Sequence, residues 1–179
     1  MAIIKPNNNT ISAITALPAA ISTGKVLQVV TFNSDTKEST TNTSFTGSLK
    51  RLSITPSATS SKILILASAS VSGSHSGETQ GIVLLRGGSV ITGASGDADG
   101  SRGLASSMAY LINSGGSVQT ISMQYLDSPA STSQQTYSIQ LKYFAGGTHT
   151  MYINRLQSDD NAQYRTRSAS FVTAMEVSA

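Results

Sequence analysis

Short segments in which apolar and polar residues alternate recur along this chain, and they restrict its fold more than any other feature. In residues 137–144, Tyr137, Ile139, Leu141 and Tyr143 alternate with mostly polar neighbours, and residues 118–125 and 171–176 repeat this pattern. A period of two places successive side chains on opposite faces of a β-strand, whereas an amphipathic helix needs a period of 3.6. Since no convincing amphipathic helix is found, the chain is predicted to be all-β.

Turn residues divide the chain into about eight to ten strands spaced by roughly 8–12 residues. Further strands are expected at residues 26–32, 44–55, 62–72, 81–86, 89–92, 104–112 and 148–154, with polar loops at 33–43, 93–103 and 155–167. The pairs Gly87-Gly88 and Gly146-Gly147 each predict a hairpin, because glycine adopts positive φ without steric cost. This pattern predicts an antiparallel β-sandwich of the jelly-roll type, and no fixed repeat suggests a propeller or solenoid.

Two segments carry predictions about the core. In the segment 62–67, Lys62 is followed by five apolar residues without interruption, so we expect a central strand buried on both faces. In residues 44–55, the side chains expected to face inward are Phe45, Leu49, Leu52 and Ile54.

Residues 1–24 differ from the rest, which places a domain boundary before the sandwich at 25–179. This stretch holds two prolines, a run of asparagines and too few apolar residues to form a core, yet it is too apolar for a linker. We interpret it as an extended N-terminal arm for docking or subunit exchange, although packing on its own domain stays open. The predicted partner-binding residues of the arm are Ile3, Ile4, Ile11, Ile14, Leu17 and Ile21.

Charge and composition exclude several partners. Charged residues make up 12% of the chain, and the formal net charge is +3. The basic residues are scattered rather than gathered in a stripe, so no nucleic-acid partner is predicted. The opening MAIIKPNNN lacks the pattern of a secretory signal, and the longest apolar run, about five residues, is too short for a membrane span. Disulfides are excluded because the chain has no cysteine.

The residues that catalysis or metal binding requires are sparse. The two histidines, His75 and His149, lie in predicted loops or turns without the spacing of a zinc site, and each is interpreted as solvated. The segment Asp97-Ala98-Asp99-Gly100 lacks the closing acidic residue of a calcium loop. Most acidic residues fall in loops, with Glu176 the main exception, and no serine lies in a complete Gly-x-Ser-x-Gly turn. The sequence therefore predicts no enzyme, and no catalytic, cofactor-binding or metal-binding residue.

Several motifs together resemble a family of virion proteins from tailed phages of marine and freshwater bacteria, cyanophages above all. These motifs cover most of residues 25–177 and are KVLQVV (25–30), ITPSATSSKILILASASV (54–71), LLRGGSVI (84–91), YLDSPASTSQQTYSIQLKYFAGG (125–147), YINR (152–155) and TAMEV (173–177). The resemblance implies a homotrimeric β-sandwich on the outside of a bacteriophage particle.

Many relatives lie at the end of a long tail fibre, but this chain has a 24-residue arm and no repetitive shaft. We therefore expect a capsid cement, or decoration, protein that binds the major capsid protein or other virion proteins and stabilises the shell. The alternative is a tail-fibre or baseplate-attached head that recognises a host surface glycan through loops 73–80, 93–103 and 155–167. A soluble hydrolase is a third class, for which no acid, base and nucleophile could be assembled.

Overall fold

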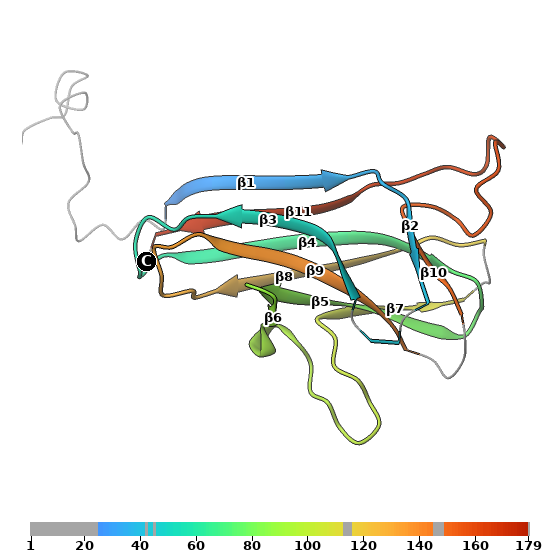
Figure 1. Ribbon diagram of the computed structural model, residues 1–179, viewed down its shortest axis with the longest axis horizontal. Coiled ribbons are helices and arrows are strands. Elements are labelled where there is room, and N and C mark those ends of the chain that lie inside the picture. Colours follow the sequence, from blue (N-terminus) through green and yellow to red (C-terminus); the bar gives the residue numbers. More distant parts are fainter. Residues whose placement is uncertain (1–24, 42, 45, 113–115, 145–148, 179) are drawn as a thin grey trace, which may run out of the picture.

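In the computed structural model, two antiparallel sheets pack face to face (Figure 1). The structure describes residues 25–178 except for 42, 45, 113–115 and 145–148. The strands are β1 (Val26–Ser34), β2 (Glu38–Thr40), β3 (Thr46–Ile54), β4 (Lys62–Gly73), β5 (Glu78–Arg86), β6 (Ser89–Val90), β7 (Ser107–Leu111), β8 (Gln119–Asp127), β9 (Gln135–Phe144), β10 (Met151–Ile153) and β11 (Ser170–Val177). A single turn of 3-10 helix, η1 (Thr92–Ala94), is the one helix among the described residues.

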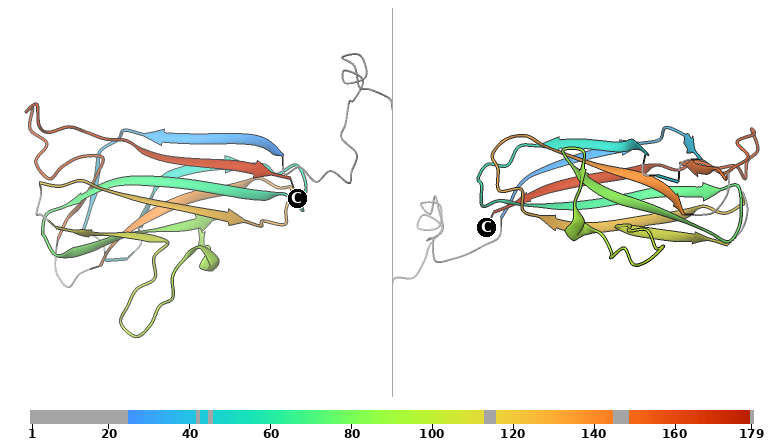
Figure 2. Two further views of the ribbon diagram at one scale, coloured as in Figure 1. Left: turned by 180° about the vertical axis from the view of Figure 1, so that it is seen from behind. Right: turned by 60° about the horizontal axis from the view of Figure 1, so that its bottom comes forward.

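The order of the strands is that of a jelly roll. In the first sheet β1 pairs with β11, β11 with β4, and β4 with β8. The last residues of β4 also pair with the short strand β10, which in turn pairs with β2. In the second sheet the order is β3-β9-β5, and both β6 and β7 pair with β5. The chain passes repeatedly between the two sheets, which form the two layers of the sandwich (Figure 2). The predicted antiparallel, jelly-roll-like sandwich is confirmed.

The core lies between the two sheets and is built from the alternate residues that the strand period places inward. Ile63, Ile65 and Val71 of β4 face Ile82 and Leu84 of β5, and all five are fully buried. Leu52 and Ile54 of β3 are buried as predicted, whereas Phe45 and the side chain of Leu49 lie outside the described part of the chain.

The prediction that residues 62–67 are buried on both faces is wrong. The strand is central, but only its odd-numbered residues face the core, and Leu64 and Leu66 are half-buried on the outer face. An antiparallel sheet packs on one face, and a continuous apolar run does not reveal which face is covered.

The two predicted glycine hairpins have different outcomes. Gly87 and Gly88 have φ values of 57° and 86°, and they join β5 to β6 as expected. The second hairpin is wrong, because β9 pairs with β3 and β5 in the second sheet while β10 pairs with β4 and β2 in the first. The turn residues mark a reversal of the chain, but they do not determine whether the next strand pairs or crosses to the other sheet. The expected polar loop at 33–43 also contains a short strand, β2.

Two buried carboxylates connect elements that are distant in sequence. Asp127 of β8 accepts hydrogen bonds from the Tyr137 hydroxyl and from Arg86 Nη1, both at 2.6 Å, and thereby joins the two sheets. Burial and the contact with Asp127 raise the pKa of Tyr137, and the opposing effect of Arg86 does not outweigh them. Glu176 of β11 accepts hydrogen bonds from the Ser57 backbone at 2.7 Å and from Gln28 Nε2 at 2.6 Å. Both contacts fix the loop after β3 and the strand β1 at one end of the sandwich.

The sandwich has two distinct ends. Lys25 and Ser178 lie side by side, since the Ser178 backbone amide donates to the Lys25 carbonyl at 2.9 Å. The opposite end, here called the distal end, carries the connections 74–77 and 154–169 (Figures 1 and 2). The predicted arm, residues 1–24 with all six of its proposed contact residues, lies outside the described residues.

Candidate functional site

The outer face of the first sheet carries an apolar row that crosses four strands. The register aligns Val29 of β1 with Met175 of β11, Met175 with Leu64 of β4, and Leu64 with Leu126 of β8. Val29 and Leu126 are about half exposed, at 51% and 53%, and the other two are half-buried. Phe171, also on this face, is 50% exposed. Apolar side chains aligned across neighbouring strands form a flat surface suited to contact with another protein.

The same face is almost without charge. Across residues 29–33, 62–70, 120–126 and 171–177, the strand alternation places a single charged side chain, Lys62, on the outside. The ammonium of Lys62 donates to the Ser128 hydroxyl at 2.8 Å, at the margin of the face. Depletion of charge around apolar and aromatic side chains is the pattern of the centre of a protein interface.

The outer face of the second sheet differs because part of the chain lies on it. The segment that follows η1 approaches Gly81 of β5 so closely that a Cβ there would lie 3.1 Å from Ala105 Cβ, and the same Cβ would lie 2.6 Å from the ring of Phe144 on β9. Glycine at position 81 therefore permits this segment to pack against the sheet. A hollow of about 600 Å³ remains beside it, lined by Asp97, Arg102, Leu104, Ala105, Met108 and Phe144, among others.

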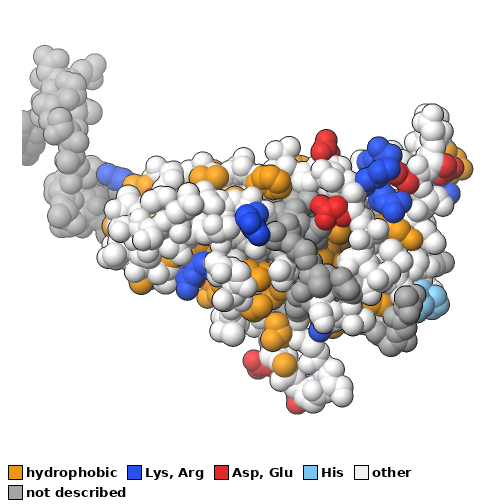
Figure 3. Space-filling view, viewed as in Figure 1, with side chains coloured by type: hydrophobic (Ala, Val, Ile, Leu, Met, Phe, Trp, Pro, Cys, Tyr) orange, Lys and Arg blue, Asp and Glu red, His pale blue; other side chains and the backbone are white. Residues whose placement is uncertain are grey.

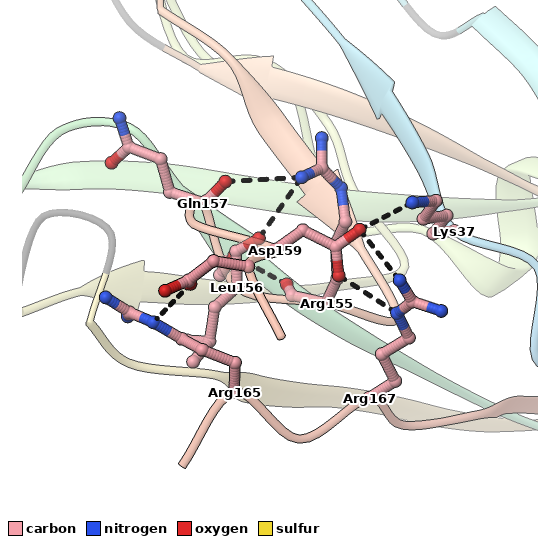
Figure 4. Close-up of polar contacts among 9 residues, drawn as sticks. Lys37, Arg155, Leu156, Gln157, Asp159, Arg165 and Arg167 are labelled. Carbon is pink, nitrogen blue, oxygen red and sulfur yellow. Dashed lines mark hydrogen bonds and ion pairs between the residues drawn. The ribbon is translucent and has the colours of Figure 1, made fainter. Parts of the chain in front are cut away.

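The long connection between β10 and β11 is held by ion pairs (Figure 4). Arg167 contacts Asp159 through Nε at 2.9 Å and Nη2 at 3.0 Å, and Lys37 contacts the same carboxylate. These two cations lower the pKa of Asp159 well below its ordinary value. Arg165 pairs with Asp160 at 3.1 Å. Opposite charges consequently lie side by side at the distal end (Figure 3).

His75, Glu78 and His149 also meet at the distal end, where histidine is exposed on the surface (Figure 3). His149 Nε2 lies 3.2 Å from Glu78 Oε1, and His75 Nδ1 lies 3.6 Å from the same oxygen. The sequence analysis did not find this cluster, because His149 comes 71 positions after Glu78 and only the fold brings the two together. The pair His75 and Glu78, three residues apart across a turn, was the one local signal.

The loops that were predicted to recognise a glycan lie in two places. Connections 74–77 and 154–169 are at the distal end, and 93–103 projects from the side of the sandwich (Figure 1). Residues 78–80 of the first predicted loop instead begin β5. Asp99, in the segment compared with a calcium loop, pairs with Arg102 at 2.9 Å.

The apolar row on the first sheet was not predicted from the sequence, because alternation alone does not reveal which apolar face of a strand stays uncovered.

Neither a protein-family model nor a curated protein matches this chain. Within the described part of the chain, no helix is long and apolar enough to cross a membrane.

Proposed function

We propose that this chain is a non-enzymatic structural protein of a bacteriophage virion, most specifically a capsid cement protein that works as a homotrimer. The motif resemblance supports the virion role, and the single structural observation that supports self-association is the almost uncharged outer face of the first sheet with its apolar row. Its occupant is a neighbouring copy of the same chain. Copies with a net charge of +3 repel one another, so an interface between them favours a face that carries almost no charge.

The jelly roll suits this role, since closed symmetric assembly covers exposed apolar faces and strand edges that would otherwise promote aggregation. β1 and β8 are the edges of the four-stranded part of the first sheet, and the apolar row reaches both of them. Contacts between copies can therefore bury the row and an edge together. A trimeric ring made in this way would present the end with Lys25 of each copy in the same direction.

Substitution of the apolar row tests the interface. Val29→Glu introduces a charge at a half-exposed position, so the fold should persist while a neighbouring copy is repelled. Light scattering on the eluting protein should give a trimer for the wild type and a monomer, or at least tenfold weaker association, for Val29→Glu. The matched control is Val90→Glu, because Val90 is 37% exposed and lies on β6 of the other sheet. A monomeric wild type, or a Val29→Glu variant that remains trimeric, would contradict the interface.

A second candidate, recognition of a host surface glycan, is favoured by the hollow beside Phe144. Phe144 supplies apolar surface to the lining of this hollow, and Arg102 and Asp97 supply polar partners for a sugar. Phe144→Ala should then abolish binding to a glycan array, and Tyr164→Ala should leave it unchanged because Tyr164 lies in the distal connection. Absence of glycan binding by the wild-type protein would eliminate this candidate.

A further inference from the structure

We propose that His75, Glu78 and His149 form a binding site for one divalent transition-metal ion, with zinc as the reference ion. The inference is independent of the proposed virion role, since it depends only on these three side chains and their surroundings. Two imidazoles and one carboxylate are a ligand set that zinc accepts, with a fourth position open to water or another group.

The spacing of the ligand atoms suits a metal ion. One ligand atom from each residue lies within 4.8 Å of the other two. Zinc bonds to nitrogen and oxygen are about 2.0–2.2 Å long, so the ligand atoms of a tetrahedral site are roughly 3.3 Å apart. The separations of 3.2 Å and 3.6 Å from Glu78 Oε1 to the two imidazoles are close to this value. The exposed side chain of His75 can rotate and so bring its ring nitrogen to the distance from the other ligand atoms that a tetrahedral site requires.

The carboxylate of Glu78 is buried without enough partners. The side chain is 6% exposed, and Oε2 has no hydrogen-bond partner among the described residues. Burial raises the pKa of Glu78, while the two imidazoles lower it. A buried carboxylate is costly unless a cation or hydrogen-bond donors compensate it. A metal ion bound by both oxygens, or by Oε1 with its water on Oε2, would supply that compensation.

The region around the cluster contains two more unsatisfied polar atoms. Tyr143 Oη and Gln80 Oε1 are buried, and neither has a partner within the described ranges. The ring of Tyr143 lies 5.9 Å from that of His149, and Gln80 lies two residues after Glu78 on the same strand. Such atoms are rare in native proteins and call for a bound water or ion. They are suitable partners for water molecules in the outer coordination sphere of the metal.

The backbone already holds the three residues near one another. The Ser74 amide donates to the Thr150 carbonyl at 2.9 Å, and the Thr150 amide donates to the Ser74 hydroxyl at 2.9 Å. These bonds link the residue before His75 to the residue after His149. Gly77, with φ of 83°, makes the turn that brings His75 back towards Glu78. The metal would therefore bind a largely preformed site, at the cost of the contact between His75 Nδ1 and the Ser76 carbonyl at 2.7 Å.

The position of the site indicates what the ion would do. His75 lies where the chain crosses from β4 in the first sheet to β5 in the second, and His149 lies where it crosses from β9 back to β10. An ion bound by His75 and His149 would link these two connections and so hold the two sheets together at the distal end. Binding to the folded state alone raises stability with the concentration of the free ion.

Titration of the full-length protein, without an affinity tag, with zinc chloride in a calorimeter tests the proposal. We expect one ion per chain, and cobalt should give visible absorption bands typical of nitrogen and oxygen ligands. The variants His75→Ala and His149→Ala should each weaken zinc binding at least tenfold. Zinc should raise the unfolding temperature of the wild type, and excess chelator should reverse that rise.

Glu78→Gln should also weaken binding at least tenfold, with Glu38→Gln as the matched control that retains it. Since Glu78 is buried, its variant could fail to fold, whereas His75 is mostly exposed and its variant should fold normally. Absence of zinc binding below about 1 mM in the wild type would overturn the proposal. Unchanged affinity in a folded His75→Ala variant would overturn it equally, because zinc would then bind elsewhere.

Discussion

Glu176 lies fully buried on β11, among donors that come from two other segments of the chain, β1 and the connection between β3 and β4. Burial by itself raises its pKa, but hydrogen bonds from Ser57, Gln28 and Ser61 outweigh that effect and lower the pKa to about 2. Since the pKa of the unfolded chain is about 4.5, the ionised carboxylate contributes stability that is fully present above pH 4.5. This contribution is lost progressively as the pH falls from 4.5 towards 2.

Replacement of this carboxylate should therefore lower stability and change its dependence on pH. Glu176→Gln removes the charge and turns an amide group towards donors, which should cost about 1–3 kcal/mol at pH 7. The free energy of unfolding of the variant should also decline less than that of the wild type between pH 4.5 and 2. Urea unfolding at a series of pH values measures both effects.

The control for this variant is Glu38→Gln, because Glu38 is half-buried on the short strand β2 rather than in the core. It should change stability less and retain the acid-induced decline. Equal acid sensitivity of wild type and Glu176→Gln would contradict the role assigned to this carboxylate.

For single residues, the sequence predicted which strand a side chain belongs to, but it did not predict the hydrogen-bond partners of that side chain. The alternation in residues 171–176 correctly placed Glu176 on a strand, opposite to Phe171. It did not reveal that Glu78 and Asp127 are buried too, since Glu78 fell within the expected loop 73–80 and Asp127 is the last residue of its strand. Which donors reach a carboxylate depends on contacts between segments as distant as Asp127 and Arg86, and local pattern contains no such information.

Among the elements, strands were predicted better than their pairing. The strand expected at 104–112 is present as β7, and the hairpin at Gly87-Gly88 is present. The connection at Gly146-Gly147 joins strands in different sheets, because the burial of two apolar faces, and not turn composition, decides where β10 pairs. The strand β2, which lies in the expected loop 33–43, brings the strands of the described residues to eleven, above the eight to ten expected.

The connection 154–169 offers a prediction for a whole element. Asp159→Asn removes the charge that Lys37 and Arg167 share, so this connection should open more often while the sheets stay intact. Hydrogen exchange should accelerate in residues 155–167 and remain unchanged in β4 and β5. High salt should produce part of the same effect in the wild type, since exposed ion pairs are screened.

Asp97→Asn is the matched control, because Asp97 belongs to the projecting segment on the other side of the sandwich. It should leave exchange in residues 155–167 unaltered. If Asp159→Asn also left that exchange unaltered, the ion pairs would not be what fixes this connection.

For the whole molecule, the two sheets have different surroundings. The second sheet is partly covered by the segment after η1, whereas the first presents an apolar row with almost no charge. The fold class followed from strand spacing, since many short strands with turn residues between them close into a sandwich. The exposed apolar row was not predicted, because within the continuous apolar run 63–67 the outward Leu64 and Leu66 cannot be told apart from the buried Ile63 and Ile65 by sequence alone.

The arm leads to a prediction on the assembled particle. Deletion of residues 2–23 should abolish binding to virions, because the proposed anchor carries Ile3, Ile4, Ile11, Ile14, Leu17 and Ile21. The sandwich should still fold, since its described core contains none of these residues. Co-sedimentation with particles that lack the protein measures binding, and circular dichroism checks the fold. Normal binding by the truncated protein would show that the anchor lies elsewhere.

The most direct test of the central claim is cryo-electron microscopy of intact virions that carry this protein, with its copy number counted. A cement protein should be present in hundreds of copies at the junctions between capsomers, as trimers whose contacts bury the row from Val29 to Leu126. Density on the tail alone, in a few to a few dozen copies and with this row facing solvent, would contradict the account.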